Sequence, residues 1–112
     1  MNETISWKDF SKIDMRTGTI VAVFEFPEAR NPSYKLHIDF GEEIGTRKTS
    51  AQVTKNYEKK ELIGLQVIAV INFPKKQIAN FMSECLILGA VENDAVILIQ
   101  PRMKVPNGLK IS

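Results

Sequence analysis

Apolar residues occupy every second position in 20–26 and again in 34–40. A period of two places such residues together on one face of a β-strand. The pattern predicts two strands, with Ile20, Ala22, Phe24 and Phe26 together on one face of the first. His37 is expected on the outer face of the second strand, opposite its apolar neighbours. Residues 44–51 are expected to form a third strand.

Two apolar runs, 65–71 and 85–90, predict buried strands farther along the chain. A helix is expected from Thr54 to Leu62, closed by Gly64. Ser6 followed by Asp9 predicts a capped N-terminal helix, which Trp7 is expected to pack over one end of the domain. The order β-β-β-α-β-β is typical of an OB-fold, a five-stranded Greek-key barrel, although periodicity alone also permits another small β-barrel.

Two apolar segments follow the residues that this barrel needs. Ala95 to Ile99 is strongly apolar, and Leu109 to Ile111 follows a Pro-Asn-Gly turn. Apolar surface that a barrel cannot cover suggests a subunit interface. We therefore expect one all-β domain over 1–112, with an N-terminal helix in 1–12, the barrel in 13–91 and a C-terminal dimerisation extension in 92–112. We expect the protein to form a homodimer through this extension.

The composition is that of a small globular domain. The chain has 112 residues, of which 44% are hydrophobic and 25% charged, enough for one core. No apolar run approaches the ~20 residues that span a bilayer, and the first residues lack the form of a signal peptide. A single cysteine, Cys85, excludes an internal disulfide. These features predict a cytoplasmic protein without membrane insertion.

The sequence offers little for catalysis. One histidine and one cysteine cannot build a zinc site, and Gly41 and Gly45 lack the Lys-Ser/Thr of a phosphate-binding loop. Cys85 lies within an apolar run, where a buried, unreactive thiol is expected. We expect no enzymatic activity, no metal and no cofactor.

Charge is distributed unevenly along the chain. The net charge is only +2, yet seven basic and two acidic residues lie between Ile44 and Met82. Such polarity would suit an anionic partner, although solvated surface lysines would give the same count.

Two segments carry a family resemblance. The first is 14–20 with Phe26-Pro27-Glu28-Ala29, and the second is 70–79 with Ser83-Glu84. In this order and spacing they resemble the tRNA-binding domain family, an OB-fold barrel found free-standing or attached to aminoacyl-tRNA synthetases. Over nearly its full length the chain is similar to free-standing, secretion-chaperone-like members, which form homodimers. The resemblance implies tRNA and unfolded or presecretory polypeptides as partners.

The loop from Asn72 to Gln77 is the best candidate site. It follows a central strand and presents adjacent ammonium groups, which bind phosphates. The resemblance implies tRNA-contacting or site-forming roles for Arg16, Asn72, Lys75, Lys76, Ser83 and Glu84. Two alternatives stay open: Arg16 would form an ion pair with Asp14, and the Ser83 hydroxyl would bond to the backbone.

One departure from the family pattern favours peptide binding. Synthetase-linked relatives carry an Arg-Gly pair where this chain has Ala79-Asn80, followed by Phe81 and Met82. Phe73, Ile78, Phe81 and Met82 would line an apolar pocket beside the lysines, unless they simply pack the loop onto the barrel. The sequence thus predicts a chaperone-like protein that binds tRNA, unfolded polypeptide or both without catalysis. The alternative is a dedicated, structure-specific tRNA-binding protein with no chaperone role.

Overall fold

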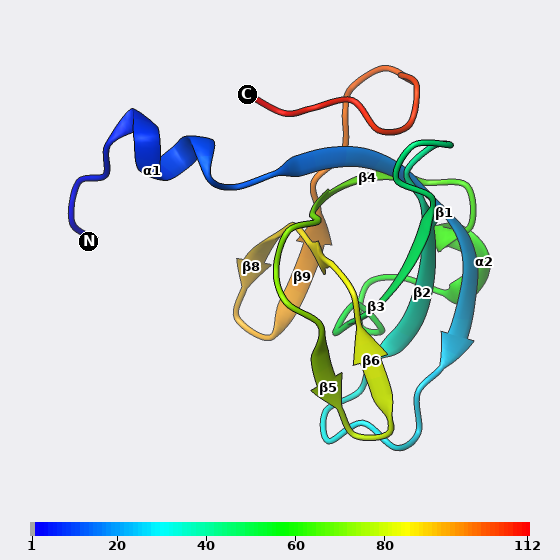
Figure 1. Ribbon diagram of the computed structural model, residues 1–112. Coiled ribbons are helices and arrows are strands. Elements are labelled where there is room, and N and C mark those ends of the chain that lie inside the picture. Colours follow the sequence, from blue (N-terminus) through cyan, green and yellow to red (C-terminus); the bar gives the residue numbers. More distant parts are fainter. Residues whose placement is uncertain (1) are drawn as a thin grey trace.

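A five-stranded antiparallel sheet with the strand order β3-β2-β1-β4-β7 curls into a nearly closed barrel (Figure 1). The computed structural model describes residues 2–112. The strands of this sheet are β1 (Met15–Glu25), β2 (Tyr34–Asp39), β3 (Thr46–Ala51), β4 (Gln66–Val70) and β7 (Leu86–Ile87). The expected barrel is confirmed.

The core fills the barrel with side chains from all five strands. Ile20, Leu36, Ile38, Phe40 and Val67 are almost completely buried. A Cβ atom on Gly18 would lie 2.6 Å from Ile38 Cγ2 and 2.8 Å from the Phe40 ring. Glycine therefore lets these two side chains pack directly against the backbone of β1.

A β-bulge in β1 changes the side-chain alternation expected for this strand. The register of β1 against β2 shifts between Ile20 and Ala22, and one extra residue moves every later side chain to the opposite face. Val23 consequently packs against the core, whereas Phe24 is exposed and lies against His37 with ring centroids 5.1 Å apart. The prediction that Ile20 and Phe24 share one face of the strand is wrong, and the outward placement of His37 is confirmed.

Both helices are short. Helix α1 (Trp7–Ser11) begins at the predicted Ser6–Asp9 capping box, but it projects from the barrel and Trp7 is 89% exposed (Figure 1). The expectation that Trp7 packs over the domain is wrong for this chain. Helix α2 (Lys59–Leu62) begins after Glu58 rather than at Thr54. The carbonyl of Tyr57 accepts a hydrogen bond from the hydroxyl of Tyr34 at 3.0 Å. This bond holds residues 54–57 in a turn rather than in the expected helix.

Two hairpins are attached to the barrel. The segment expected to be a loop contains β5 (Lys76–Ile78) and β6 (Phe81–Ser83), with Ala79 at the turn in a left-handed conformation (φ 53°). The run 85–90 is divided, because β8 (Gly89–Glu92) turns away from β7 to pair with β9 (Ala95–Leu98). Leu98 fills the core, whereas Val91 and Ile97 remain exposed.

The C-terminal tail lies along the part of β1 that β2 leaves uncovered. Thr17 exchanges backbone hydrogen bonds with Gly108 and Leu109, and Ile111 N–H donates to Met15 at 2.9 Å. The side-chain amide of Gln66 donates a hydrogen bond to the C=O of Val105 and accepts one from its N–H. None of the helices within residues 2–112 is long and apolar enough to cross a membrane.

Candidate functional site

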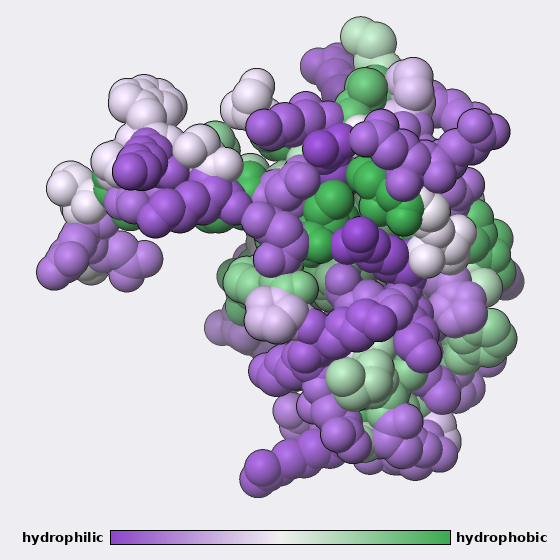
Figure 2. Space-filling model, in the orientation of Figure 1, coloured by the Kyte–Doolittle hydropathy of each residue, from purple (hydrophilic) through white to green (hydrophobic). Residues whose placement is uncertain are grey.

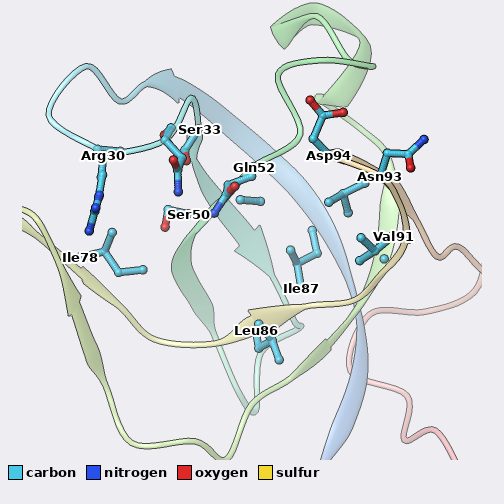
Figure 3. A pocket seen from close by; sticks show the side chains of 15 residues that line it. Arg30, Ser33, Ser50, Gln52, Ile78, Leu86, Ile87, Val91, Asn93 and Asp94 are labelled. Carbon is cyan, nitrogen blue, oxygen red and sulfur yellow. The ribbon is translucent and has the colours of Figure 1, made fainter. Parts of the chain in front are cut away.

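An apolar hollow opens between β3, β7 and the β8–β9 hairpin (Figure 3). It has a volume of about 520 Å³. Its apolar lining includes Ile78, Leu86, Ile87, Val91 and Val96. Arg30 lies at the end near Ile78, and Asn93 and Asp94 lie at the other end, as Figure 3 shows. The hollow thus combines an apolar wall with polar ends.

A second hollow of about 670 Å³ adjoins the first. The two share Ser50, Ile78 and Leu86, and together we call them the trough. The second part is lined by Phe73, Pro74, Lys75, Lys76 and Gln77. The face shown in Figure 2 is mostly hydrophilic, with hydrophobic residues gathered in several smaller groups.

The two adjacent lysines predicted as a site lie at the rim of the trough. Both are exposed. Lys75 Nζ lies 3.6 Å from Glu84 Oε2, whereas no carboxylate within residues 2–112 lies within ion-pair distance of Lys76. Phe73, which is 56% exposed, lies beside them. The expected combination of positive charge and apolar surface is therefore present here.

Phe81 and Met82 lie outside the trough. Phe81 is only 9% exposed, and its ring meets that of Phe26 edge-on with centroids 5.5 Å apart. Met82 is exposed and pairs across the hairpin with Gln77. The structure thus joins Phe73 and Ile78 to the lysines and places Phe81 and Met82 elsewhere.

A second group of positive charges surrounds Phe81. Lys48 Nζ lies 5.3 Å from the centre of its ring, and Lys35 Nζ lies 5.8 Å from it. In the part of the chain that the structure describes, neither ammonium group has a carboxylate within ion-pair distance. Cation–π contacts of this kind stabilise a charge without neutralising it. Both ammonium groups therefore stay available to an anion.

Arg16 and Asn72 stabilise the base of the N-terminal segment. Arg16 Nε donates to Asp14 Oδ1 at 2.6 Å, which raises the pKa of Arg16, and its Nη1 donates to the carbonyl of Gly108. Asn72 accepts from Asp14 N–H and donates to the carbonyl of Lys12. The ion-pair alternative for Arg16 is confirmed, and neither residue lines the trough.

Ser83 and Glu84 close the barrel on the side of β3. Ser83 Oγ is buried and bonds to Thr49 Oγ1 and to the carbonyl of Cys85, so the backbone-bonded alternative is confirmed. Glu84 exchanges two hydrogen bonds with Lys48, since its N–H donates to the Lys48 carbonyl and its Oε1 accepts the Lys48 N–H. These contacts join β3 to the segment before β7.

The thiol of Cys85 is buried, as predicted. Burial in the core raises the pKa of Cys85 to about 12, because a thiolate there would lose its hydration. Within residues 2–112 no cluster of His, Cys, Asp or Glu is arranged to hold a metal ion. The site chemistry present is that of charge, aromatic rings and apolar surface.

Several trough residues escaped the sequence analysis. Leu86 belongs to the apolar run 85–90, which predicts a buried strand, and Val91 follows that run without a predicted role. Lys35 could have been recognised from its outward position in the alternating strand 34–40. Its proximity to Phe81 could not, because that depends on how the hairpin packs against β3.

The family model described as "Putative tRNA binding domain" matches residues 15–110. Among curated proteins, the methionine–tRNA ligase of Pyrococcus furiosus is 35% identical over 107 residues, which are 96% of this chain and 14% of the ligase. The chain thus spans about a seventh of the length of the ligases it matches.

Solved structures of free-standing proteins match over their full length. Chaperone CsaA from Bacillus anthracis is 50% identical with a TM-score of 0.93, covering 98% of this chain and 100% of that one. CsaA from Picrophilus torridus is 53% identical with a TM-score of 0.91, covering 97% and 100%. The predicted resemblance to the family and to its chaperone-like members is confirmed.

Proposed function

The chain belongs to the tRNA-binding domain family, and from this premise we propose that it binds tRNA and unfolded polypeptide without catalysing a reaction. The observation that carries the proposal is the position of Lys75 and Lys76 at the rim of an apolar trough. Ammonium groups bind phosphate, and apolar walls bind the exposed side chains of an unfolded chain. The structural likeness to CsaA chaperones supports the polypeptide partner.

The proposed tRNA surface includes two groups of lysines. Lys75 and Lys76 form one, and Lys35 and Lys48 around Phe81 form the other. Lys76 begins β5 and Lys75 precedes it, whereas Lys35 lies on β2 and Lys48 on β3. Nonspecific contacts of lysine with phosphate give affinity without sequence choice, so tRNA would be recognised by its shape. A tRNA ligand would place the protein in the cytoplasm.

The proposed polypeptide partner is an unfolded, presecretory chain. Phe73, Ile78 and Leu86 would receive its apolar side chains. We also propose a homodimer through the exposed apolar residues Ile97, Ile99 and Leu109. Two subunits would present two troughs to one long polypeptide, which raises the effective concentration.

A competition experiment tests whether the two ligands share the site. Labelled tRNA and a labelled, reduced and unfolded polypeptide are titrated against the same protein, and each is then displaced by the other in unlabelled form. Mutual displacement is expected because Lys75 and Lys76 lie at the rim of the trough. Binding of tRNA with no binding of polypeptide would instead support a dedicated tRNA-binding protein.

A further inference from the structure

Strand β3 ends the barrel sheet with a free edge at Ser50. Lys48 uses its N–H and C=O to bond Glu84, on the side away from β2. Backbone groups alternate in direction along a strand, so those of Ser50, two residues on, point the same way. Within residues 2–112, Ser50 pairs with no strand other than β2, and no backbone group outside the strands bonds to its N–H or C=O. Its carbonyl accepts only from the Thr49 hydroxyl, at 3.3 Å.

Strand β7 has a matching free edge at Ile87. Leu88 N–H donates to the carbonyl of Ile68 on β4 at 2.9 Å. Ile87 pairs with Ala69 on the same ladder. By the same alternation, its N–H and C=O point away from β4. In the described chain they too lack a backbone partner beyond the sheet.

The two free edges face one hollow. Ser50 and Ile87 both line the first part of the trough, with Ile78, Leu86, Val91 and Val96 around them (Figure 3). The gap between β3 and β7 is closed beside Ser50, at Thr49. There Thr49 Oγ1 donates to the carbonyl of Cys85 at 2.7 Å. The barrel is therefore joined at one end of its seam and open at the other.

We propose that an extended segment of unfolded polypeptide adds to β3 as a strand at Ser50, inside this opening. The proposal rests on the polypeptide half of the function proposed above and names its mode of binding. The segment pairs its main chain with the N–H and C=O of Ser50 and faces Ile87 across the trough. Its alternate side chains lie against Ile78 and Leu86 or against Val91 and Val96.

The chemistry of the trough favours a peptide over RNA. Unpaired backbone donors and acceptors at a sheet edge are complementary to another peptide backbone. RNA phosphates need cations, and the lysines lie at the rim of the second hollow. The first hollow has Arg30 at one end, but at the other end Asp94 carries a carboxylate whose pKa is lowered by its bond to Lys55. Pairing through the main chain also depends little on side-chain identity. One site could therefore bind unfolded polypeptides of different sequence.

Backbone methylation tests the mode of binding on the unaltered protein. The probe is a short fluorescein-labelled peptide in which valine and threonine alternate. Two analogues carry N-methyl groups on alternate amides, one along each edge of the extended peptide. Each lost backbone bond costs about threefold to tenfold in affinity. We expect at least one analogue to lose affinity by that factor or more, with the other weakened less.

Two variants at one position give a matched test in the protein. Ser50→Pro removes the outward N–H, which β2 does not use, and should weaken peptide binding by about tenfold. Ser50→Ala keeps the N–H and should bind the peptide like the natural protein. Circular dichroism and the midpoint of urea denaturation report whether both variants are folded.

Three outcomes would overturn strand addition. The first is equal binding of the methylated analogues and the parent peptide, which would mean recognition through side chains alone. The second is that Ser50→Pro changes the sedimentation coefficient instead of the peptide affinity, which would mean that a second copy of the chain covers the edge. The third is failure of the alternating peptide to bind while a longer unfolded polypeptide binds. If no unfolded polypeptide binds at all, the polypeptide half of the proposed function fails as well.

Discussion

The ring of Phe26 meets the ring of Phe81 edge-on, with centroids 5.5 Å apart. Phe26 follows β1, and Phe81 begins β6, so this contact ties the β1–β2 loop to the hairpin that carries the basic residues. Lys35 lies over both rings, 5.2 Å from the centre of Phe26 and 5.8 Å from that of Phe81. The position of the hairpin therefore depends on an aromatic pair.

Removing the Phe81 ring should destabilise the protein. Phe81→Ala leaves a cavity beside Phe26 and is expected to lower the free energy of unfolding by about 3 kcal/mol. The neighbouring Met82→Ala, at an exposed site, should cost less than about 1 kcal/mol. Urea denaturation of both variants measures the difference. Equal stability of the two would mean that the aromatic contact does not hold the hairpin.

Lys75 and Lys76 should contribute to tRNA affinity through phosphate contacts. Each contact adds about 0.7 to 0.9 to the slope of log affinity against log salt. The double variant Lys75→Ala/Lys76→Ala should therefore flatten this slope by about 1.5. The matched control is Lys59→Ala/Lys60→Ala on α2, away from the trough, which should leave the slope unchanged. If the slope of the first variant is unchanged, Lys75 and Lys76 do not contact tRNA phosphates, and Lys35 and Lys48 become the candidate tRNA site.

Burial of Cys85 predicts a stability that falls at high pH. Its pKa is raised from an ordinary value near 9 to about 12 in the folded chain. Above the ordinary value the unfolded thiol loses its proton first, so the folded state binds more protons and stability drops as pH rises from 9 towards 12. The contribution is about 1.4 kcal/mol per pH unit in that window. Denaturation of Cys85→Ala at the same pH values should lack this contribution, and the two pH profiles should then run in parallel below pH 9.

A charge on the β8–β9 hairpin should break the proposed dimer. Ile97 is 40% exposed on this hairpin, and Ile97→Lys would place an ammonium group within an apolar interface. Sedimentation velocity at micromolar concentration should give a dimer for the natural chain and a monomer for the variant. Ile63→Lys, at an exposed position after α2, is the control and should remain dimeric. A natural chain that sediments as a monomer would exclude the interface altogether.

Strand β2 could be predicted from the sequence because its apolar and polar residues alternate clearly. Residues 34–40 bury Leu36, Ile38 and Phe40 as expected, since period two and burial agree. The bulge after Ile20 could not be predicted, because residues 20–24 are all apolar and an extra residue among them leaves no mark on the pattern. Because of that single extra residue, the side chain of Phe24 points away from the core.

The candidate site could be predicted only in part. Adjacent lysines after a central strand mark an exposed basic loop, and the structure places Lys75 and Lys76 there. Pairing of Ile78 with Phe81 turns the supposed loop into a hairpin and directs Phe81 onto Phe26. Such a contact between distant segments depends on the packing of the whole barrel, which no local pattern encodes.

The tail along β1 has a consequence for protein synthesis. The bond from Ile111 N–H to Met15 and the bridge between Arg16 and Lys110 join residues nearly a whole chain apart. A chain still being made on the ribosome can pair β1 with β2 long before these contacts can form. The edge at Thr17 therefore stays open until Gly108 and Leu109 have emerged, and unpaired strand edges of this kind are where nascent chains associate wrongly. Completion of the sheet beside β1 is coupled to translation of residues 108–111.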